Sequence, residues 1–261
     1  MPMQLSIEVD LNYSVASAGA AILTLEAART GGQEIRREAL DLTPSEGIRV
    51  VPGDEGIGLR RLIPIEERLE CRYRAEIAIT RAQPAMAAMK TVEIPDLSAE
   101  VLRYLLPSRY CDSDRLVHFV ATRFEGLTGG ALVASARDWI EENLAYVPGV
   151  STARTTAIDT FLERRGVCRD YAHLLVAMCR AGQVPARIAS VYGVGVDPQD
   201  FHAVAQVHLD GAWHLVDPTG MSAADAMAVI AVGRDATDVA FLTTIADARL
   251  EDQRVQVRRL A

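Results

Sequence analysis

Cysteine is scarce in this sequence. Its 261 residues include only four, Cys71, Cys111, Cys168 and Cys179, and no two of them have the CxxC spacing of a metal or redox motif. Four scattered cysteines are also too few for the disulfide framework of a small secreted domain. We therefore expect a reduced protein located in the cytoplasm.

Positive charge and long apolar runs are scarce as well. Lysine and arginine number 27 against 35 aspartates and glutamates, so the formal net charge is −8. An acidic chain has no general electrostatic footprint for nucleic acid. No apolar run approaches the roughly 20 residues of a membrane-spanning helix, and the first residues alternate apolar and polar instead of resembling a signal peptide. We expect neither nucleic acid nor a membrane as a partner.

The first hundred residues predict a β-sandwich. Residues 4–15 alternate apolar and polar side chains, which is the period of a half-buried strand. Short apolar runs follow, and glycine- and proline-containing turns separate them at intervals of roughly 8–12 residues, as is typical of a sandwich. We expect residues 1–100 to form this accessory domain and residues 101–261 to form the catalytic domain.

The second domain has helices first and strands afterwards. Helical spacing of apolar residues predicts four helices, over residues 111–124, 131–144, 155–165 and 168–181. Apolar or alternating runs then predict strands over residues 186–192, 203–209 and 212–216, with a terminal pair around 226–232 and 254–260. This order indicates an α+β fold in which helices pack on an antiparallel sheet.

Cys168 is the candidate nucleophile. It follows Gly166-Val167 and begins an apolar helix. Its thiol should therefore lie at a helix N-terminus, where unpaired N–H groups and the helix dipole favour an anion such as a thiolate. Arg165 and Arg169 add positive charge nearby. Cys179 lies further along the same helix without such a setting, and we interpret it as core packing.

A predicted hairpin brings together a base and the group that orients it. Asp210-Gly211 between two alternating runs is typical of a two-residue type I′ turn. His202 and Asp217 then become diagonal neighbours on one face, roughly 5–8 Å apart at Cβ. The register pairs Leu209 with Ala212, His208 with Trp213, Gln206 with Leu215, and Val204 with Asp217. Packing of the Cys168 helix against that face would complete a Cys-His-Asp triad.

Each of these residues has an ordinary structural interpretation when taken alone. Many cysteines at helix starts are inert, and an aspartate before a proline often begins a turn. Their conjunction is what favours a catalytic site. The other histidines, His118, His173, His208 and His214, have no cysteine or carboxylate at metal-ligand spacing, so we expect no metal and no other cofactor.

Several segments between Tyr104 and Val239 resemble the transglutaminase-like superfamily in its bacterial form. They arrive in the family's order: Arg165–Leu175 (RGVCRDYAHLL), Val184–Ile188 (VPARI), Asp200–Ala203 (DFHA), Gly211–Thr219 (GAWHLVDPT) and Val232–Val239 (VGRDATDV). The resemblance implies a papain-like core preceded by a β-sandwich. It also implies that Cys168 is the nucleophile, His202 the general base and acid, and Asp217 the residue that orients His202.

The chain departs from the animal transglutaminases of that superfamily. Those enzymes place a tryptophan shortly after a Gly-Val-Ser segment to stabilise the oxyanion, whereas Arg154 or Thr155 stands near the corresponding position here. The long insertions and calcium sites of the animal enzymes are also missing. The resemblance to compact relatives therefore implies that the protein hydrolyses an amide bond rather than cross-linking proteins.

We conclude from the sequence that the protein is a peptidase-like cysteine amide hydrolase or acyl transferase that works through a thioester on a peptide or protein substrate. A protein-glutamine transglutaminase and a non-catalytic binding module on the same fold remain as alternatives. The second oxyanion donor is left open among Tyr146, Trp139 and Arg154.

The role of four arginines is also left open. Arg164, Arg165, Arg169 and Arg187 either form surface charge with one structural ion pair, Arg187 with Asp170, or they recognise a substrate carboxylate.

Overall fold

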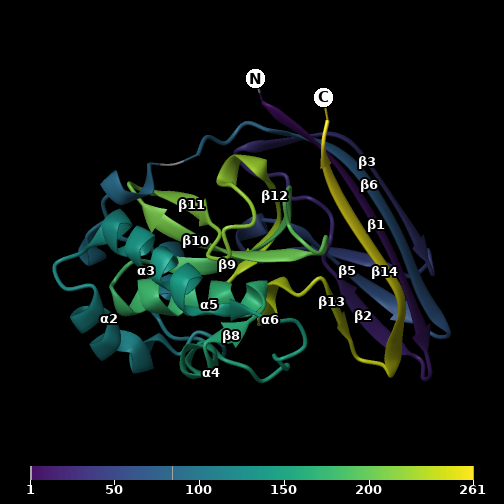
Figure 1. Ribbon diagram of the computed structural model, residues 1–261. Coiled ribbons are helices and arrows are strands. Elements are labelled where there is room, and N and C mark those ends of the chain that lie inside the picture. Colours follow the sequence, from purple (N-terminus) through teal and green to yellow (C-terminus); the bar gives the residue numbers. More distant parts are fainter. Residues whose placement is uncertain (1, 84, 261) are drawn as a thin grey trace.

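A computed structural model describes residues 2–83 and 85–260 (Figure 1). Two four-stranded sheets form a sandwich at one end of the molecule, and a third four-stranded sheet with the helices forms the other end. The arrangement confirms the expected α+β class with an antiparallel catalytic sheet.

The sandwich consists of two antiparallel sheets. The first has the order β14-β1-β6-β3, with β1 (Met3–Val15), β3 (Gln33–Thr43), β6 (Arg68–Ile79) and β14 (Ala248–Arg259). The second has the order β13-β2-β5-β4, with β2 (Gly19–Leu23), β4 (Arg49–Pro52), β5 (Leu59–Ile65) and β13 (Leu242–Thr244).

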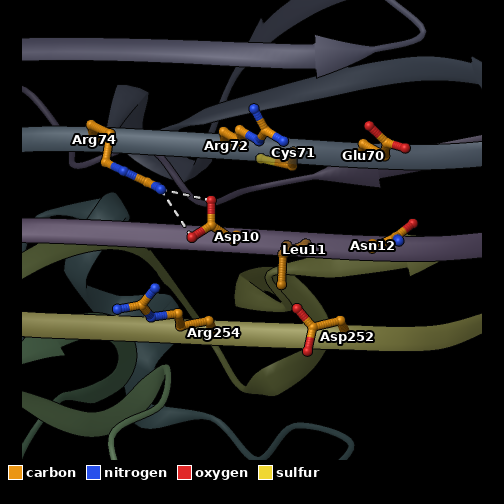
Figure 2. A pocket seen from close by; sticks show the side chains of 9 residues that line it. All are labelled: Asp10, Leu11, Asn12, Glu70, Cys71, Arg72, Arg74, Asp252 and Arg254. Atoms are coloured by element: carbon orange, nitrogen blue, oxygen red, sulfur yellow. Dashed lines mark hydrogen bonds and ion pairs between the residues drawn. The ribbon is translucent and has the colours of Figure 1, made fainter.

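Alternation along the strands decides which face of the first sheet is buried. Ile7, Val9 and Leu11 point inward and are fully or nearly fully buried. The outer face carries charged side chains, among them Asp10 on β1 and Arg74 on β6, which form an ion pair at 2.7 Å (Figure 2). One face packs while the other is hydrated, as is common in antiparallel sheets.

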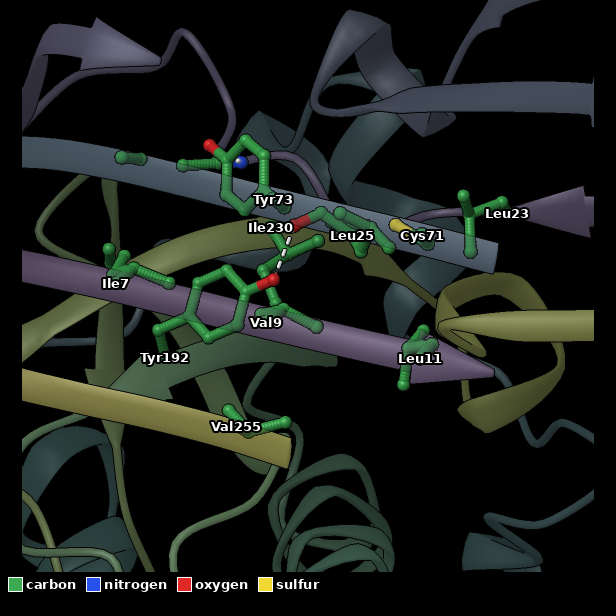
Figure 3. Packing of buried hydrophobic residues seen from close by; sticks show 14 of the residues in the cluster. Ile7, Val9, Leu11, Leu23, Leu25, Cys71, Tyr73, Tyr192, Ile230 and Val255 are labelled. Carbon is green, nitrogen blue, oxygen red and sulfur yellow. Dashed lines mark hydrogen bonds between the residues drawn. The ribbon is translucent and has the colours of Figure 1, made fainter. Parts of the chain in front are cut away.

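The sandwich shares its apolar core with the catalytic sheet. Tyr192 and Ile230, from two strands of that sheet, pack among Ile7, Val9 and their neighbours (Figure 3). The Tyr192 hydroxyl donates a hydrogen bond of 2.6 Å to the Leu25 carbonyl oxygen. Burial of apolar area contributes about 25 cal/mol per Å², so this common core couples the two parts of the chain.

The last two strands belong to the sandwich. The expected pairing of residues 226–232 with residues 254–260 within the second domain is wrong. Instead β14 pairs with β1, and β13 pairs with β2. The reason is that alternation in β14, with Val255 and Val257 buried, suits any half-buried edge strand, and only the tertiary structure selects its neighbour. The expected second domain, residues 101–261, therefore does not include its last two strands, which lie in the sandwich. The domain boundary at residue 100 stays a prediction.

The catalytic sheet has the order β11-β10-β9-β12. Its strands are β9 (Ala186–Gly193), β10 (His202–Leu209), β11 (Ala212–Val216) and β12 (Met227–Gly233). Asp210 and Gly211, with φ of 48° and 76°, form the turn between β10 and β11. Positive φ at both positions is what a type I′ turn requires. The predicted pairs from Leu209–Ala212 to Gln206–Leu215 are confirmed.

The helices cover one face of this sheet. They are α2 (Val117–Arg123), α3 (Gly129–Asn143), α4 (Ala157–Glu163) and α5 (Cys168–Ala181). Two further helices, α1 (Ala99–Leu102) and α6 (Ala236–Val239), are single turns. Helix α5 is buried along nearly its whole length and packs on the face that carries Ala205, Val207 and Leu209. A helix that is covered on most sides belongs to the core, and α5 is part of the core from Asp170 to Arg180.

Candidate active site

Cys168 is the first residue of α5 and its side chain is partly exposed. The preceding Gly166 lies in the short strand β8 (Arg165–Gly166), which pairs in parallel with β7 (Ala145–Tyr146). The Asp170 carboxylate turns back to accept a hydrogen bond of 2.8 Å from the Val167 N–H. A Cβ at Gly166 would lie 2.7 Å from the Cβ of Asp170. Glycine at 166 therefore allows the cap that fixes the start of the helix.

The other three cysteines lie in different surroundings. Cys71, Cys111 and Cys179 are buried, and burial raises the pKa of each thiol to about 12. A buried thiol in apolar surroundings is a poor nucleophile because it remains protonated. Cys168 is therefore the cysteine suited to react.

His202 and Asp217 form a buried pair. The His202 Nε2 lies 2.9 Å from Asp217 Oδ2, and both side chains are almost completely covered. The same Oδ2 accepts a hydrogen bond from the Ser222 N–H, while Oδ1 accepts from the N–H and the hydroxyl of Thr219. The carboxylate is thus held by four donors, which fixes the direction in which it presents itself to the imidazole.

The electrostatics of this pair favour an imidazolium beside a carboxylate. Burial lowers the pKa of His202, but the hydrogen bond to Asp217 and the adjacent Cys168 thiol outweigh it and raise the pKa to about 10. Burial raises the pKa of Asp217, but its hydrogen bonds with His202 and Thr219 bring the pKa below its usual value. Among the described residues, His202 Nδ1 is buried without a hydrogen-bond partner. Since Nε2 is bonded to Asp217, Nδ1 is the ring nitrogen that can interact with the Cys168 thiol.

The route by which the three residues meet differs from the expected one. Strand β11 ends at Val216, so the expected Val204–Asp217 pair lies outside the ladder. The expectation that α5 packs against the His202 face is wrong, because α5 covers the opposite face of β10. Cys168 and His202 are each the first residue of their element. They therefore meet where α5 and β10 begin, and not across the packed face.

Tyr146 is the oxyanion candidate that lies at the nucleophile. Burial and the Cys168 thiol raise the pKa of Tyr146 to about 12, while a hydrogen bond from the Cys168 backbone N–H acts in the opposite direction. Trp139 instead stacks on Phe161 within the helical core. The backbone N–H of Arg154 bonds to Thr152 in an exposed loop. Tyr146 therefore has a hydrogen bond with Cys168, whereas these contacts of Trp139 and Arg154 are with other residues.

The arginines have mainly structural partners. The Arg164 guanidinium lies over the rings of Trp139 and Phe161, with 4.4 Å and 4.5 Å to their centroids. Arg165 pairs with Glu163 at the surface, and Arg169 pairs with Asp170.

Arg187 does not pair with Asp170, so that expectation is wrong. Arg187 pairs with Glu55 at 2.6 Å and donates to Gln206 Oε1 at 2.8 Å. Gln206 lies on the sheet face turned away from α5, and Arg187 is its register partner on that same face.

A contact that is not expected from the sequence holds the loop before His202 against the sandwich. The side chain of Gln199 forms two hydrogen bonds with the backbone of Val257 on β14, at 2.7 and 3.2 Å. Gln253 donates a hydrogen bond of 2.6 Å to Asp200 Oδ1. No local pattern signals these contacts, because the partners are more than fifty residues apart in the chain.

Within residues 2–83 and 85–260, no group of three or more His, Cys, Asp and Glu side chains is arranged to hold a metal ion. In the same ranges, no helix combines the length and the apolar character that crossing a membrane requires.

Comparison with known proteins shows similarity to a family model, to a solved structure and to a curated protein. The family model of the transglutaminase-like superfamily matches residues 102–218. A solved structure, described as that of a proposed cysteine protease from Cytophaga hutchinsonii, is 32% identical and superposes with a TM-score of 0.93, covering 100% of this chain and 92% of that one. The uncharacterized protein ML0607 of Mycobacterium leprae is 35% identical over 144 residues, 50% of each chain. This chain thus spans about half the length of that curated relative.

Proposed function

The chain belongs to the transglutaminase-like superfamily, and from this premise we propose that it is a cysteine-dependent amide hydrolase whose triad is Cys168, His202 and Asp217. The buried His202–Asp217 pair carries the proposal, together with His202 Nδ1, which lies beside the Cys168 thiol and has no hydrogen-bond partner among the described residues. A base oriented by a carboxylate next to a thiol is the arrangement that nucleophilic cysteine catalysis needs. The likeness to the Cytophaga hutchinsonii protein supports a peptide or protein substrate.

In the acylation step, the Cys168 thiolate attacks the carbonyl carbon of an amide. Because the pKa of His202 is raised to about 10, its imidazolium is present at neutral pH. Its Nδ1–H protonates the departing amine as the C–N bond breaks, and a thioester on Cys168 remains. Asp217 accepts the Nε2–H of His202, which fixes the orientation of the ring, and its negative charge balances the imidazolium before substrate binds.

The oxyanion of the tetrahedral intermediate needs two donors. The Cys168 backbone N–H at the helix start supplies one, once the substrate oxygen replaces its contact with Tyr146, and the Tyr146 hydroxyl supplies the other. A pKa near 12 keeps Tyr146 protonated at neutral pH, so it remains a donor. Donors aimed at developing charge are worth about 10²–10³ in rate each.

Deacylation decides between hydrolase and transferase. Neutral His202, left after it has protonated the amine, removes a proton from the attacking water, and the thioester is released as an acid. Amine transfer requires apolar or aromatic walls that exclude water, and aromatic residues make up 5% of this sequence. Water is therefore the proposed acceptor, in a reaction that we place in the cytoplasm and that uses no cofactor.

One labelling experiment tests the nucleophile. Intact protein is treated with iodoacetamide between pH 5 and pH 9, and the modified cysteine is identified by mass spectrometry. We expect Cys168 to react first, and its reaction at pH 6 to slow when His202 is replaced by alanine. First labelling at Cys71, Cys111 or Cys179 would overturn the assignment.

A second experiment tests the reaction. Ammonia release from a glutamine peptide and incorporation of a fluorescent amine are followed in the same sample, with Cys168→Ser as the blank. Ammonia release without incorporation supports hydrolysis, whereas efficient incorporation at millimolar amine supports a transglutaminase. Peptide binding with no acylation of Cys168 would support a non-catalytic module.

A further inference from the structure

A cavity of about 560 Å³ lies on the side of the catalytic sheet that α5 does not cover. Its walls come from β9, β10, β11 and β12 and from sandwich segments around residues 30–32, 55–57 and 81–82. The volume lies within the range of sites for small molecules. Cys168, His202 and Tyr146 do not line it, so the cavity is separate from the proposed active site.

Two buried polar side chains face this cavity. Arg187 is 2% exposed and Gln206 is 7% exposed. The Arg187 Nε donates to Gln206 Oε1, and its Nη1 donates to Glu55. Within the described part of the chain, Arg187 Nη2 and Gln206 Nε2 have no hydrogen-bond partner, yet neither atom is fully enclosed. Both donors are therefore open to the cavity and can donate to a ligand that enters it.

The charge of the lining favours an anion. Arg81 and Arg187 line the cavity with one carboxylate, Glu55, which leaves one net positive charge. Both oxygens of Glu55 are engaged, one by Arg187 and the other by the Tyr104 hydroxyl at 2.5 Å. Arg81 donates from Nη1 to two carbonyl oxygens, those of Ala224 and Met227. This local excess of positive charge contrasts with the −8 of the whole chain.

Most of the remaining lining is apolar. Leu215, Val229 and Val232 are buried on the sheet side, and Ile57 packs beside them from the sandwich. The ring of Trp213 lies 4.0 Å from the Arg187 guanidinium carbon and also lines the cavity. Polar donors at one place in an otherwise apolar pocket orient a ligand whose head is polar and whose body is not.

We propose that this cavity binds a small monocarboxylate with an apolar body, its carboxylate held by Arg187 Nη2 and Gln206 Nε2 and its body lying against Leu215, Val229 and Val232. A carboxylate accepts both free donors at once and balances the net positive charge. An amine would add charge of the same sign, and an alkane would leave both donors unpaired.

Trp213 provides the readout. The chain has two tryptophans, Trp139 and Trp213. Trp139→Phe makes Trp213 the single emitter, and its fluorescence is titrated with sodium octanoate, octanamide and octylamine. We expect a saturable change with octanoate and at least tenfold weaker binding of the other two compounds, because a hydrogen-bonded charge pair is worth about a factor of ten. Equal binding of octanamide or octylamine, or no saturable change with octanoate, overturns the proposal.

Two variants locate the site. Gln206→Leu removes one donor and should weaken octanoate binding at least tenfold. Because that change lies in the core, Ala82→Phe gives an independent test: Ala82 is exposed at the cavity wall, and a phenyl ring there should block the cavity. Ala87→Phe, exposed and outside the cavity lining, is the matched control and should bind as the parent does. Unchanged binding in Ala82→Phe overturns the assignment to this cavity.

Discussion

Replacement of Asp217 by asparagine tests the triad most directly. The shape is retained, but an amide carries one acceptor oxygen where the carboxylate has two. Oδ2 faces His202 and the Ser222 N–H, whereas Oδ1 faces Thr219. In either orientation of the amide, Nδ2 therefore points at a backbone N–H and leaves it unsatisfied.

The magnitudes follow from those contacts. An unsatisfied buried donor costs about 1–3 kcal/mol, and at roughly 2–4 °C per kcal/mol for a chain of this size the midpoint of unfolding should fall by about 2–12 °C. Without the carboxylate, the imidazolium is no longer held in the productive orientation. A drop of about 10⁴ in kcat is known for the equivalent change in a serine protease triad, and we expect a loss of about 10³–10⁴ here.

The pH dependence has a definite sign. The folded-state pKa of His202, about 10, lies above its ordinary value of 6.5. Its stabilising contribution is therefore fully present below pH 6.5 and is lost as the pH rises through about 10. The stability gap between the parent and Asp217→Asn should be largest at pH 6 and should shrink toward pH 10, leaving the part due to the unsatisfied N–H.

Thermal unfolding at pH 6, 8 and 10, amide hydrolysis, and the NMR titration of the His202 ring measure these effects, with the exposed Asp114→Asn as the control. The reasoning is refuted if Asp217→Asn keeps its kcat within tenfold of the parent. It is equally refuted if His202 in the parent titrates near 6.5.

Three further predictions concern the surroundings of the triad. Tyr146→Phe should lower kcat about 10²–10³-fold with little change in KM, and an unchanged kcat would remove Tyr146 from the oxyanion site. Gly166→Ala brings a methyl within 2.7 Å of the Asp170 Cβ and should lower the unfolding midpoint by several degrees in calorimetry. Gly31→Ala, with no atom within 4 Å of the added methyl, should leave the midpoint unchanged. Equal midpoints for the two variants would contradict the close contact at Gly166. Gln253→Ala removes an anchor of the β9–β10 loop and should lower kcat a few-fold with an unchanged midpoint, and steady-state kinetics that match the parent would show that this anchor is dispensable.

Local elements of the site are encoded in the sequence. Asp210-Gly211 can take positive φ at both positions, so the turn and the register up to Gln206–Leu215 follow from a few residues. The start of α5 at Cys168 follows from the apolar helical spacing that begins there. These features depend on backbone preferences and on periodicity within about fifteen residues, and both can be recognised without knowledge of the rest of the chain.

The tertiary structure alone decided which surfaces meet. Both faces of the hairpin are apolar enough to be covered, so its pattern did not reveal that α5 packs on the Ala205 face while sandwich loops and the Glu55–Arg187 pair lie on the other. For the same reason the partner of β14 and the approach of Tyr146 to Cys168 could not be inferred. Such choices depend on which buried areas fit together over the whole molecule, and that information is distributed among residues far apart in the sequence.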